Sequence, residues 1–446
     1  MHIPDGYISP ATAGVMYAAA VPVWAVAAGR VKKVLSGRTV PLLSIFAALT
    51  FAIMMFNVPV PGGTTAHGVG GTLTAIVLGP WAAVITTSVA LVIQALFFGD
   101  GGITAIGANC FNMAIVLPFV GYISYRLIAG RSDALSQRRV IAAAIGSYLG
   151  ITAAAICVGV LLGIQPHLWS TNGVPDYSPY GFSTAIPAML VSHALGASFV
   201  EAAITALGVA YLQKSFPELL PGPRAAEPGA ESEARRINPW VPAGGFIAFA
   251  ALVVFVAGFI KGSGDIKTWA GLDWTTVDWT AAGQTVLVSA LVSVVVLPLL
   301  FVLLRKRAGI RAAAILFVAL MIWAPIGLIA PGGAFGEDTS ATQAQVTTAL
   351  QARVNGDPAL FDALPDVNKE CSCVPTNINN VTFAGRTLLS GYQPPWVSST
   401  DPAWQQNIGY QLAGLIGIGV FVFGSFGLLQ FGRRLAPQAP PDWRTA

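Results

Sequence analysis

Residues 68–98 have the sequence GVGGTLTAIVLGPWAAVITTSVALVIQALFF, and this apolar stretch decides how often the chain crosses a membrane. It is longer than the roughly 20 residues that one spanning helix needs. Gly79-Pro80 interrupts it, because proline lacks a backbone N–H and disfavours helix in the residue before it. We therefore predict two helical pieces, near 68–78 and 81–98.

The composition of the whole chain also belongs to a membrane protein. Hydrophobic residues make up 54% of its 446 residues, charged residues only 10%, and the mean hydropathy is +0.68. An ordinary soluble domain has roughly 25% charged residues. The net charge of +4 comes mostly from Lys and Arg beside apolar runs. That pattern orients a membrane protein, so nucleic-acid partners are excluded.

The first half is expected to carry seven helices, with its N-terminus outside the cell. No Lys or Arg precedes Arg30, so the first apolar run lacks the charged start of a signal peptide and is expected to be retained. The basic residues 30–38 and 131–139 should be cytoplasmic, which places residues 58–67 outside and requires an odd number of crossings before residue 131. Besides the two pieces above, the predicted spans are 10–29, 41–58, 104–128, 140–163 and 186–212.

A polar segment divides the chain into two membrane domains. Residues 1–213 form the first, residues 214–238 are rich in Pro, Glu, Arg and Ala and are predicted to be a cytoplasmic linker, and residues 239–446 form the second. Four further spans are expected near 241–260, 284–304, 312–330 and 407–431, with a large outer loop at 331–406 and a cytoplasmic C-terminus. The predicted fold is an all-α polytopic membrane protein.

The chain start offers three nitrogens to one metal ion. The Met1 amine, the His2 amide nitrogen and the His2 imidazole can close adjacent five- and six-membered chelate rings in one plane. A fourth nitrogen is available from His67, which the topology places on the same outer side. A planar nitrogen set suits nickel or copper, whereas zinc prefers a tetrahedron. A single histidine is nevertheless more often a structural residue than a ligand, and this alternative stays open at this point.

Several motifs resemble the cobalt/nickel substrate-binding components of energy-coupling factor importers. The resemblance covers residues 1 to about 213, and its motifs are MHIPDGYISP (1–10), GGTTAH (62–67), LGPWAA (78–83), QALFFGDGG (94–102), AIGAN (105–109) and NMA (112–114).

This resemblance implies a function and a ligand set. Family members have seven helices and hold the metal by the N-terminal amine, the amide and imidazole nitrogens of the second residue and one further histidine, which correspond here to Met1, His2 and His67. They work with a membrane coupling protein and a pair of cytoplasmic ATPases in the plasma membrane. Ni(II) or Co(II) would then be the transported substrate, with no organic cofactor. The chain also lacks a phosphate-binding G-x-x-x-x-G-K-[ST] loop, so an enzyme is not expected.

The second half resembles the small accessory subunit that is fused to, or works with, these binding components. The similar stretches are IAPGGAFGE (329–337) and GYQPPW (391–396). The family's usual Pro-Asp-Gly-Leu-Glu signature is altered here, and four spans replace the usual two. In related systems the accessory loop helps metal reach or leave the site, and only that general role carries over.

Neighbouring polar residues are candidates for supporting the metal ligands. Asp5, Tyr7 and Ser9 could fix the N-terminal loop by hydrogen bonds, although Asp5-Gly6 could equally be only a turn. Three polar side chains at membrane depth, Asn109, Asn112 and Gln94, must find partners, either between helices or lining the site.

Other ionisable and sulfur-containing residues allow more than one interpretation. His193 and Glu201 lie two turns apart on one predicted helix face, where packing or contact with the coupling protein is favoured over coordination. His167 is expected to be solvated in a loop, and Cys110 and Cys157 to be free thiols. Cys371 and Cys373 could bind soft metal or form a disulfide.

Two other classes of function compete with the importer subunit. A stand-alone secondary transporter would be expected to show repeated halves, which residues 1–213 and 239–446 do not display. A membrane enzyme or metallochaperone is disfavoured because no acid, base and nucleophile set converges in the sequence.

Overall fold

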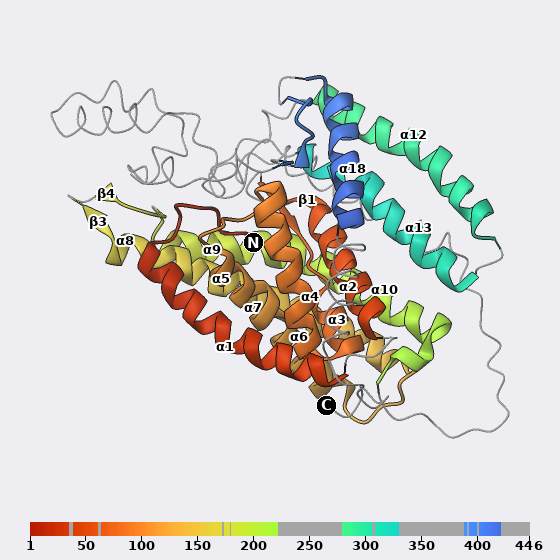
Figure 1. Ribbon diagram of the computed structural model, residues 1–446, viewed down its shortest axis with the longest axis horizontal. Helices are drawn as coiled ribbons and strands as arrows, with labels where there is room; N and C mark the ends of the chain where they lie inside the picture. Colours follow the sequence, from red (N-terminus) through yellow and green to blue (C-terminus); the bar gives the residue numbers. More distant parts are fainter. Residues whose placement is uncertain are drawn as a thin grey trace.

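The computed structural model describes residues 1–34, 39–60, 64–171, 174–178, 180–221, 279–305, 308–329, 388–389, 392–398 and 401–420. Helices dominate this part of the chain, so the predicted all-α membrane fold is confirmed (Figure 1). Six described helices are long and apolar enough to cross a membrane, and two shorter apolar helices accompany them. The chain is a multi-pass membrane protein.

Each of the seven helices predicted in the first half is present within a few residues of its expected place. Three of them contain a π-helical segment, labelled η, which replaces the regular i to i−4 bonding for a turn or more. The seven are α1 (Pro10–Val34), α2 (Thr39–Met55), α3 (Gly71–Leu78), α4 with η1 (Pro80–Ile93, Gln94–Phe98), α5 with η2 and α6 (Ile106–Asn109, Cys110–Val116, Leu117–Ala129), α7 (Gln137–Gly163), and α9 with η3 and α10 (Phe182–Ser192, His193–Ala197, Ser198–Ser215).

The predicted break in residues 68–98 lies at Gly79. Gly79 has φ 89° and ψ 155°, a backbone conformation that side-chain-bearing residues avoid, and Pro80 follows as the first residue of α4. The preceding α3 has only eight residues, which rise about 12 Å. This is less than half of a hydrocarbon core of about 30 Å. The helix α3 alone is therefore too short to cross a membrane.

The segment before α3 is a β-hairpin, which the sequence analysis did not predict. Strand β1 (Asn57–Val60) pairs antiparallel with β2 (Thr64–His67), and Asn57 lies opposite His67. Instead of forming an open loop, the two strands contribute Val58, Val60 and Ala66 to the buried main core. That this segment lies outside the cell stays a prediction. Apolar side chains on both strands draw the hairpin into the bundle.

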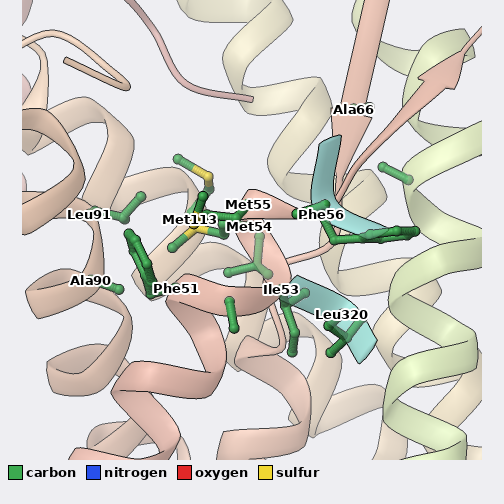
Figure 2. Close-up of a cluster of buried hydrophobic side chains, with 14 of the residues drawn as sticks. Phe51, Ile53, Met54, Met55, Phe56, Ala66, Ala90, Leu91, Met113 and Leu320 are labelled. Carbon is green, nitrogen blue, oxygen red and sulfur yellow. The ribbon is translucent and has the colours of Figure 1, made fainter. Parts of the chain in front are cut away.

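The main core surrounds the end of α2. Phe51 to Phe56 are completely buried, and residues of β2, α4, η2 and α13 pack around them (Figure 2). Because the hairpin follows α2 after a single residue, this core holds β1 and β2 in place. A short helix α8 (Gln165–Leu168), the strand pair β3 (Ser170–Thr171) and β4 (Val174–Pro175), and the turn η4 (Pro217–Leu219) complete the first half.

The second half packs against α2 and β1. It contains α12 (Trp279–Leu303), α13 (Ala308–Trp323), the 3-10 turn η7 (Ala324–Ile329) and α18 (Ala403–Gly419), which group together in Figure 1. These correspond to the spans predicted at 284–304, 312–330 and 407–431. The predicted span 241–260, residues 222–238 of the linker, and Cys371 and Cys373 lie outside the described residues.

Candidate metal site

The first residues of the chain are fixed by the side chain of Asn109. Its Oδ1 accepts a hydrogen bond from the Ile3 N–H at 2.8 Å, and its Nδ2 donates to the Ile3 carbonyl at 3.1 Å. The Gly102 N–H donates to the same carbonyl at 2.8 Å. Ile3 itself is buried. Asn109, at the junction of α5 and η2, therefore holds the N-terminus beside the loop after η1.

Asp5 ties the N-terminal segment to that loop a second time. Its Oδ1 accepts hydrogen bonds from the Thr104 N–H at 2.8 Å and the Thr104 hydroxyl at 2.6 Å. The close approach requires a glycine, since a Cβ on Gly102 would lie 2.4 Å from the Asp5 nitrogen. Asp5 thus does more than form a turn, and Thr104 is a partner that sequence reasoning missed.

Ser9 and Tyr7 lie further from the chain start and anchor the entry to α1. The Ser9 hydroxyl accepts a hydrogen bond from the Thr12 N–H at 3.0 Å, and Pro10 is the first residue of the helix. This is an ordinary N-cap followed by proline. Tyr7 is buried, and its carbonyl accepts from the Ser178 N–H at 3.0 Å. Both residues hold the N-terminal segment in place without contacting His2 or His67 in these hydrogen bonds.

The structure brings His2 and His67 together. Their ring centroids are 5.0 Å apart with an interplanar angle of 72°. The His67 Nδ1 lies 2.8 Å from the Gly68 carbonyl. A carbonyl only accepts hydrogen bonds, so Nδ1 carries the proton and Nε2 presents a lone pair. A backbone partner of this kind commonly orients a metal-binding histidine.

Burial disfavours the protonated form of both imidazoles. It lowers the pKa of His67 well below its ordinary value, and the charge of the N-terminal amine lowers it further, with contributions from His2 and His193. The pKa of His2 is also lowered, chiefly by burial, while Asp100 opposes the shift. Neutral imidazole is the form that binds a metal ion.

Asp100 is a residue of the site that the sequence analysis quoted in a motif without giving it a role. Its Oδ1 lies 3.1 Å from the His2 Nδ1. Among the described residues, the His2 Nε2 has no hydrogen-bond partner. The only sequence signal was a carboxylate between glycines after an apolar helix, Gly99-Asp100-Gly101, which by itself indicates a turn.

Glu201 supports the backbone next to His67. Its carboxylate accepts hydrogen bonds from the Val69 N–H at 2.6 Å and the Gly70 N–H at 2.8 Å. These N–H groups stand at the start of α3, where backbone donors lack partners within the helix. The expectation of packing within the bundle fits Glu201.

The remaining candidates differ in their surroundings. The His193 Nδ1 lies 2.8 Å from the Met189 carbonyl, and its buried Nε2 finds no partner in the described part of the chain; the same holds for the Asn112 amide. Gln94 donates hydrogen bonds to Asp100 and Tyr392. His167 is exposed and stacks on Phe182, and Cys110 and Cys157 are free.

The arrangement offers nitrogen donors from both main chain and side chains. Within the described residues, His, Cys, Asp and Glu side chains alone do not form a group of three suited to a metal ion. The His2 amide and the Met1 amine lie in the same tightly held segment as the His2 ring. Such a set of nitrogens favours late divalent transition metals over magnesium or calcium, which prefer oxygen ligands.

Comparison with known proteins agrees with this chemistry. The family described as the cobalt uptake substrate-specific transmembrane region, CbiM, matches residues 2–219. The fused nickel transport protein NikMN of Rhodobacter capsulatus is 46% identical over 283 residues, which are 63% of this chain and 79% of that protein. The cobalt transport protein CbiM of Geobacter sulfurreducens is 31% identical over 292 residues, 63% of this chain and 78% of that protein.

A solved structure is also similar to part of the chain. It is described as a truncated transition metal transporter, is 55% identical, and covers 48% of this chain and 98% of its own chain with a TM-score of 0.45. The similarity to the nickel protein, over 283 residues, is longer than the first 219 residues and therefore continues beyond them.

Proposed function

Because the chain belongs to the CbiM family of cobalt uptake substrate-specific transmembrane regions, we propose that it is the metal-capturing subunit of an importer for Ni(II) or Co(II). The observation that carries the proposal is the pair of histidine side chains, His2 and His67, whose ring centroids are 5.0 Å apart beside the N-terminal amine. The order of metal affinities favours nickel over cobalt at such a nitrogen site.

The proposed ligands are the Met1 amine, the His2 amide nitrogen, the His2 Nδ1 and the His67 Nε2. The first three close two chelate rings on one metal ion, and the hydrogen bond from the His67 Nδ1 to the Gly68 carbonyl leaves the His67 Nε2 lone pair free. The amine must lose its proton and the amide must be deprotonated by the metal, so binding releases protons. Asn109 and Asp5 support the chelate by fixing the segment that carries it.

Transport itself is assigned to a larger assembly. We propose that a membrane coupling protein and two cytoplasmic ATPases drive the metal inward after capture, as in energy-coupling factor importers. The site then faces outward, the C-terminus is cytoplasmic, and residues 214–238 link two membrane domains. The extracytoplasmic loop expected at 331–406 lies mostly outside the described residues, and α18 already begins at Ala403.

Tagging the two ends of the chain tests the proposal. A peptide fused ahead of Met1 removes the free amine, whereas one fused after Ala446 leaves it intact. We expect the N-tagged protein to reach the membrane without retaining nickel and the C-tagged protein to retain it. The measurement is nickel content and uptake, with and without the coupling protein and ATPases. Equal nickel content in both forms excludes the N-terminal site, and uptake without the ATPases indicates a secondary transporter.

A further inference from the structure

Among the described residues of the second half, Tyr392 contacts the carboxylate that lies beside His2. The Tyr392 hydroxyl donates to Asp100 Oδ2 at 2.5 Å, while Asp100 Oδ1 lies 3.1 Å from the His2 Nδ1. Gln94 donates to the Tyr392 hydroxyl at 2.7 Å and to Asp100 Oδ2 at 3.3 Å. One carboxylate therefore bridges a proposed metal ligand and a residue of the second half.

Tyr392 is held firmly in this place. Its ring stacks on Phe98 with centroids 5.0 Å apart, and the Leu389 N–H donates to the Phe97 carbonyl at 2.9 Å. Among the described residues it alone has a positive φ, 59°, without being glycine. This conformation is unfavourable for a bulky residue and persists only where surrounding contacts enforce it.

The hydroxyl is a hydrogen-bond donor to the carboxylate under all ordinary conditions. Burial raises the pKa of Tyr392 well above its usual value, and the neighbouring Asp100 raises it further. The Gln94 amide already occupies an acceptor position of the hydroxyl. The remaining proton is therefore directed to Asp100.

We propose that Tyr392 is a positioning residue for metal capture, which holds Asp100 in place when the metal ion replaces that carboxylate on the His2 Nδ1. The proposal rests on the proposed function, because it takes His2 Nδ1 as a ligand. In the chelate this nitrogen binds the metal, its proton moves to the His2 Nε2, and it can no longer contact Asp100. Oδ1 then loses its partner, and Tyr392 and Gln94 still satisfy Oδ2.

The physical reason is the cost of leaving a poorly solvated carboxylate without donors. Asp100 has a side chain only 24% exposed. A hydrogen bond to a charged group contributes more than one between neutral groups, and removing one partner exposes the other to the full desolvation penalty. Removing the Tyr392 hydroxyl therefore costs more free energy once His2 binds the metal and no longer contacts Asp100. The second half thus stabilises the metal-loaded form through a single hydroxyl.

The test is a double-mutant cycle on the full chain, with NiCl₂ titrated calorimetrically into detergent-solubilised protein. Tyr392→Phe keeps the ring and its stacking and removes only the hydroxyl; we expect about tenfold weaker nickel binding. In an Asp100→Asn background the same substitution should have no further effect. The matched control is Tyr125→Phe, which also removes a buried hydroxyl that contacts a charged group, Arg139, near the opposite end of the α5–α6 span.

Each outcome bears on one claim. Unchanged affinity in Tyr392→Phe overturns the positioning role, as does an equal loss in the presence and absence of the Asp100 carboxylate, or an equal loss in Tyr125→Phe. Thermal unfolding without nickel checks that Tyr392→Phe is folded. His67→Ala is measured in parallel, because nickel binding that survives this change overturns the proposed site itself rather than the role of Tyr392.

Discussion

At the scale of single residues, the proposed metal site depends on which nitrogen of each histidine is free to bind metal. Gly68 fixes the proton of His67 on Nδ1 and leaves Nε2 as the donor atom. Asp100 instead faces the Nδ1 of His2, which is the nitrogen that a planar chelate requires. The two histidines therefore have opposite arrangements. In the proposed site the Nε2 of His67 is free to bind metal, whereas the Nδ1 of His2 must exchange the Asp100 carboxylate for the metal ion.

His67→Ala removes one proposed ligand of four. We expect nickel affinity to fall by at least about a hundredfold, since even partners of ligands contribute ten- to a hundredfold. The fold should persist because β2 keeps its backbone pairing with β1. Calorimetric titration measures the affinity, and His167→Ala, at an exposed histidine outside the site, is the control. Unchanged binding in His67→Ala would remove it from the ligand set.

Sequence reasoning found some of these residues and missed others for a physical reason. His67 and Asn109 lie in motifs that resemble those of a known family, and chelate chemistry pointed to His2. Asp100 and Tyr392 are separated by 292 residues, and their contact exists only because the second half docks on the end of α4. Neither residue type nor spacing indicates such a contact.

At the scale of elements, the crossing predicted at 68–78 is the short helix α3, which follows a β-hairpin. The turn signal Pro61-Gly62-Gly63 between two short runs was present in the sequence. The strand before this turn was overlooked because residues 41–58 are apolar, and a hydropathy window does not distinguish an apolar strand from the end of an apolar helix. The break at Gly79 was predictable, since proline and glycine act locally and need no tertiary partner.

Gly79→Ala tests whether this break requires glycine. No neighbouring atom would contact the added methyl group, so the effect isolates the backbone. At φ 89° alanine is strained, and we expect a loss of about 1–3 kcal/mol in the free energy of unfolding. Thermal unfolding in detergent is the measurement. A variant as stable as the wild type would show that α3 and α4 join without strain.

Glu201 gives a second test at this scale. Glu201→Ala leaves the Val69 and Gly70 N–H groups without their acceptor. We expect this to lower the free energy of unfolding by about 1–3 kcal/mol and to disturb the backbone beside His67. Glu201→Gln keeps one acceptor oxygen and should lose less. We expect both the unfolding temperature and the nickel affinity to be highest in the wild type, lower in Glu201→Gln and lowest in Glu201→Ala. Equal values for Gln and Ala would show that the acceptor is unimportant.

At the scale of the whole molecule, the two halves meet where the metal is proposed to bind. Tyr392 contacts Asp100, and Tyr410 of α18 donates to the Met55 carbonyl at 3.0 Å, two residues before β1. The same region contains η7, whose Gly327 lies against Asn57, the partner of His67 in the hairpin. The second half therefore contacts the surroundings of both histidines, which a composition-based division into domains does not reveal.

The proposed import of metal requires that the end of the bundle with His2 and His67 face outward. Leu168 in α8 lies near the N-terminal segment, since Gln165 Oε1 accepts from the Ser9 N–H, and Leu135 lies at the start of α7 beside the basic residues 131–139. Both are exposed.

In a chain carrying Cys371→Ser and Cys373→Ser, we expect an impermeant thiol reagent to label Leu168→Cys in intact cells. Leu135→Cys should react only after the membrane is permeabilised, because basic loops stay in the cytoplasm. The unsubstituted background chain corrects for Cys110 and Cys157. Labelling of Leu135→Cys alone in intact cells would place His2 and His67 on the cytoplasmic side, where they could release a metal ion but could not capture one from outside.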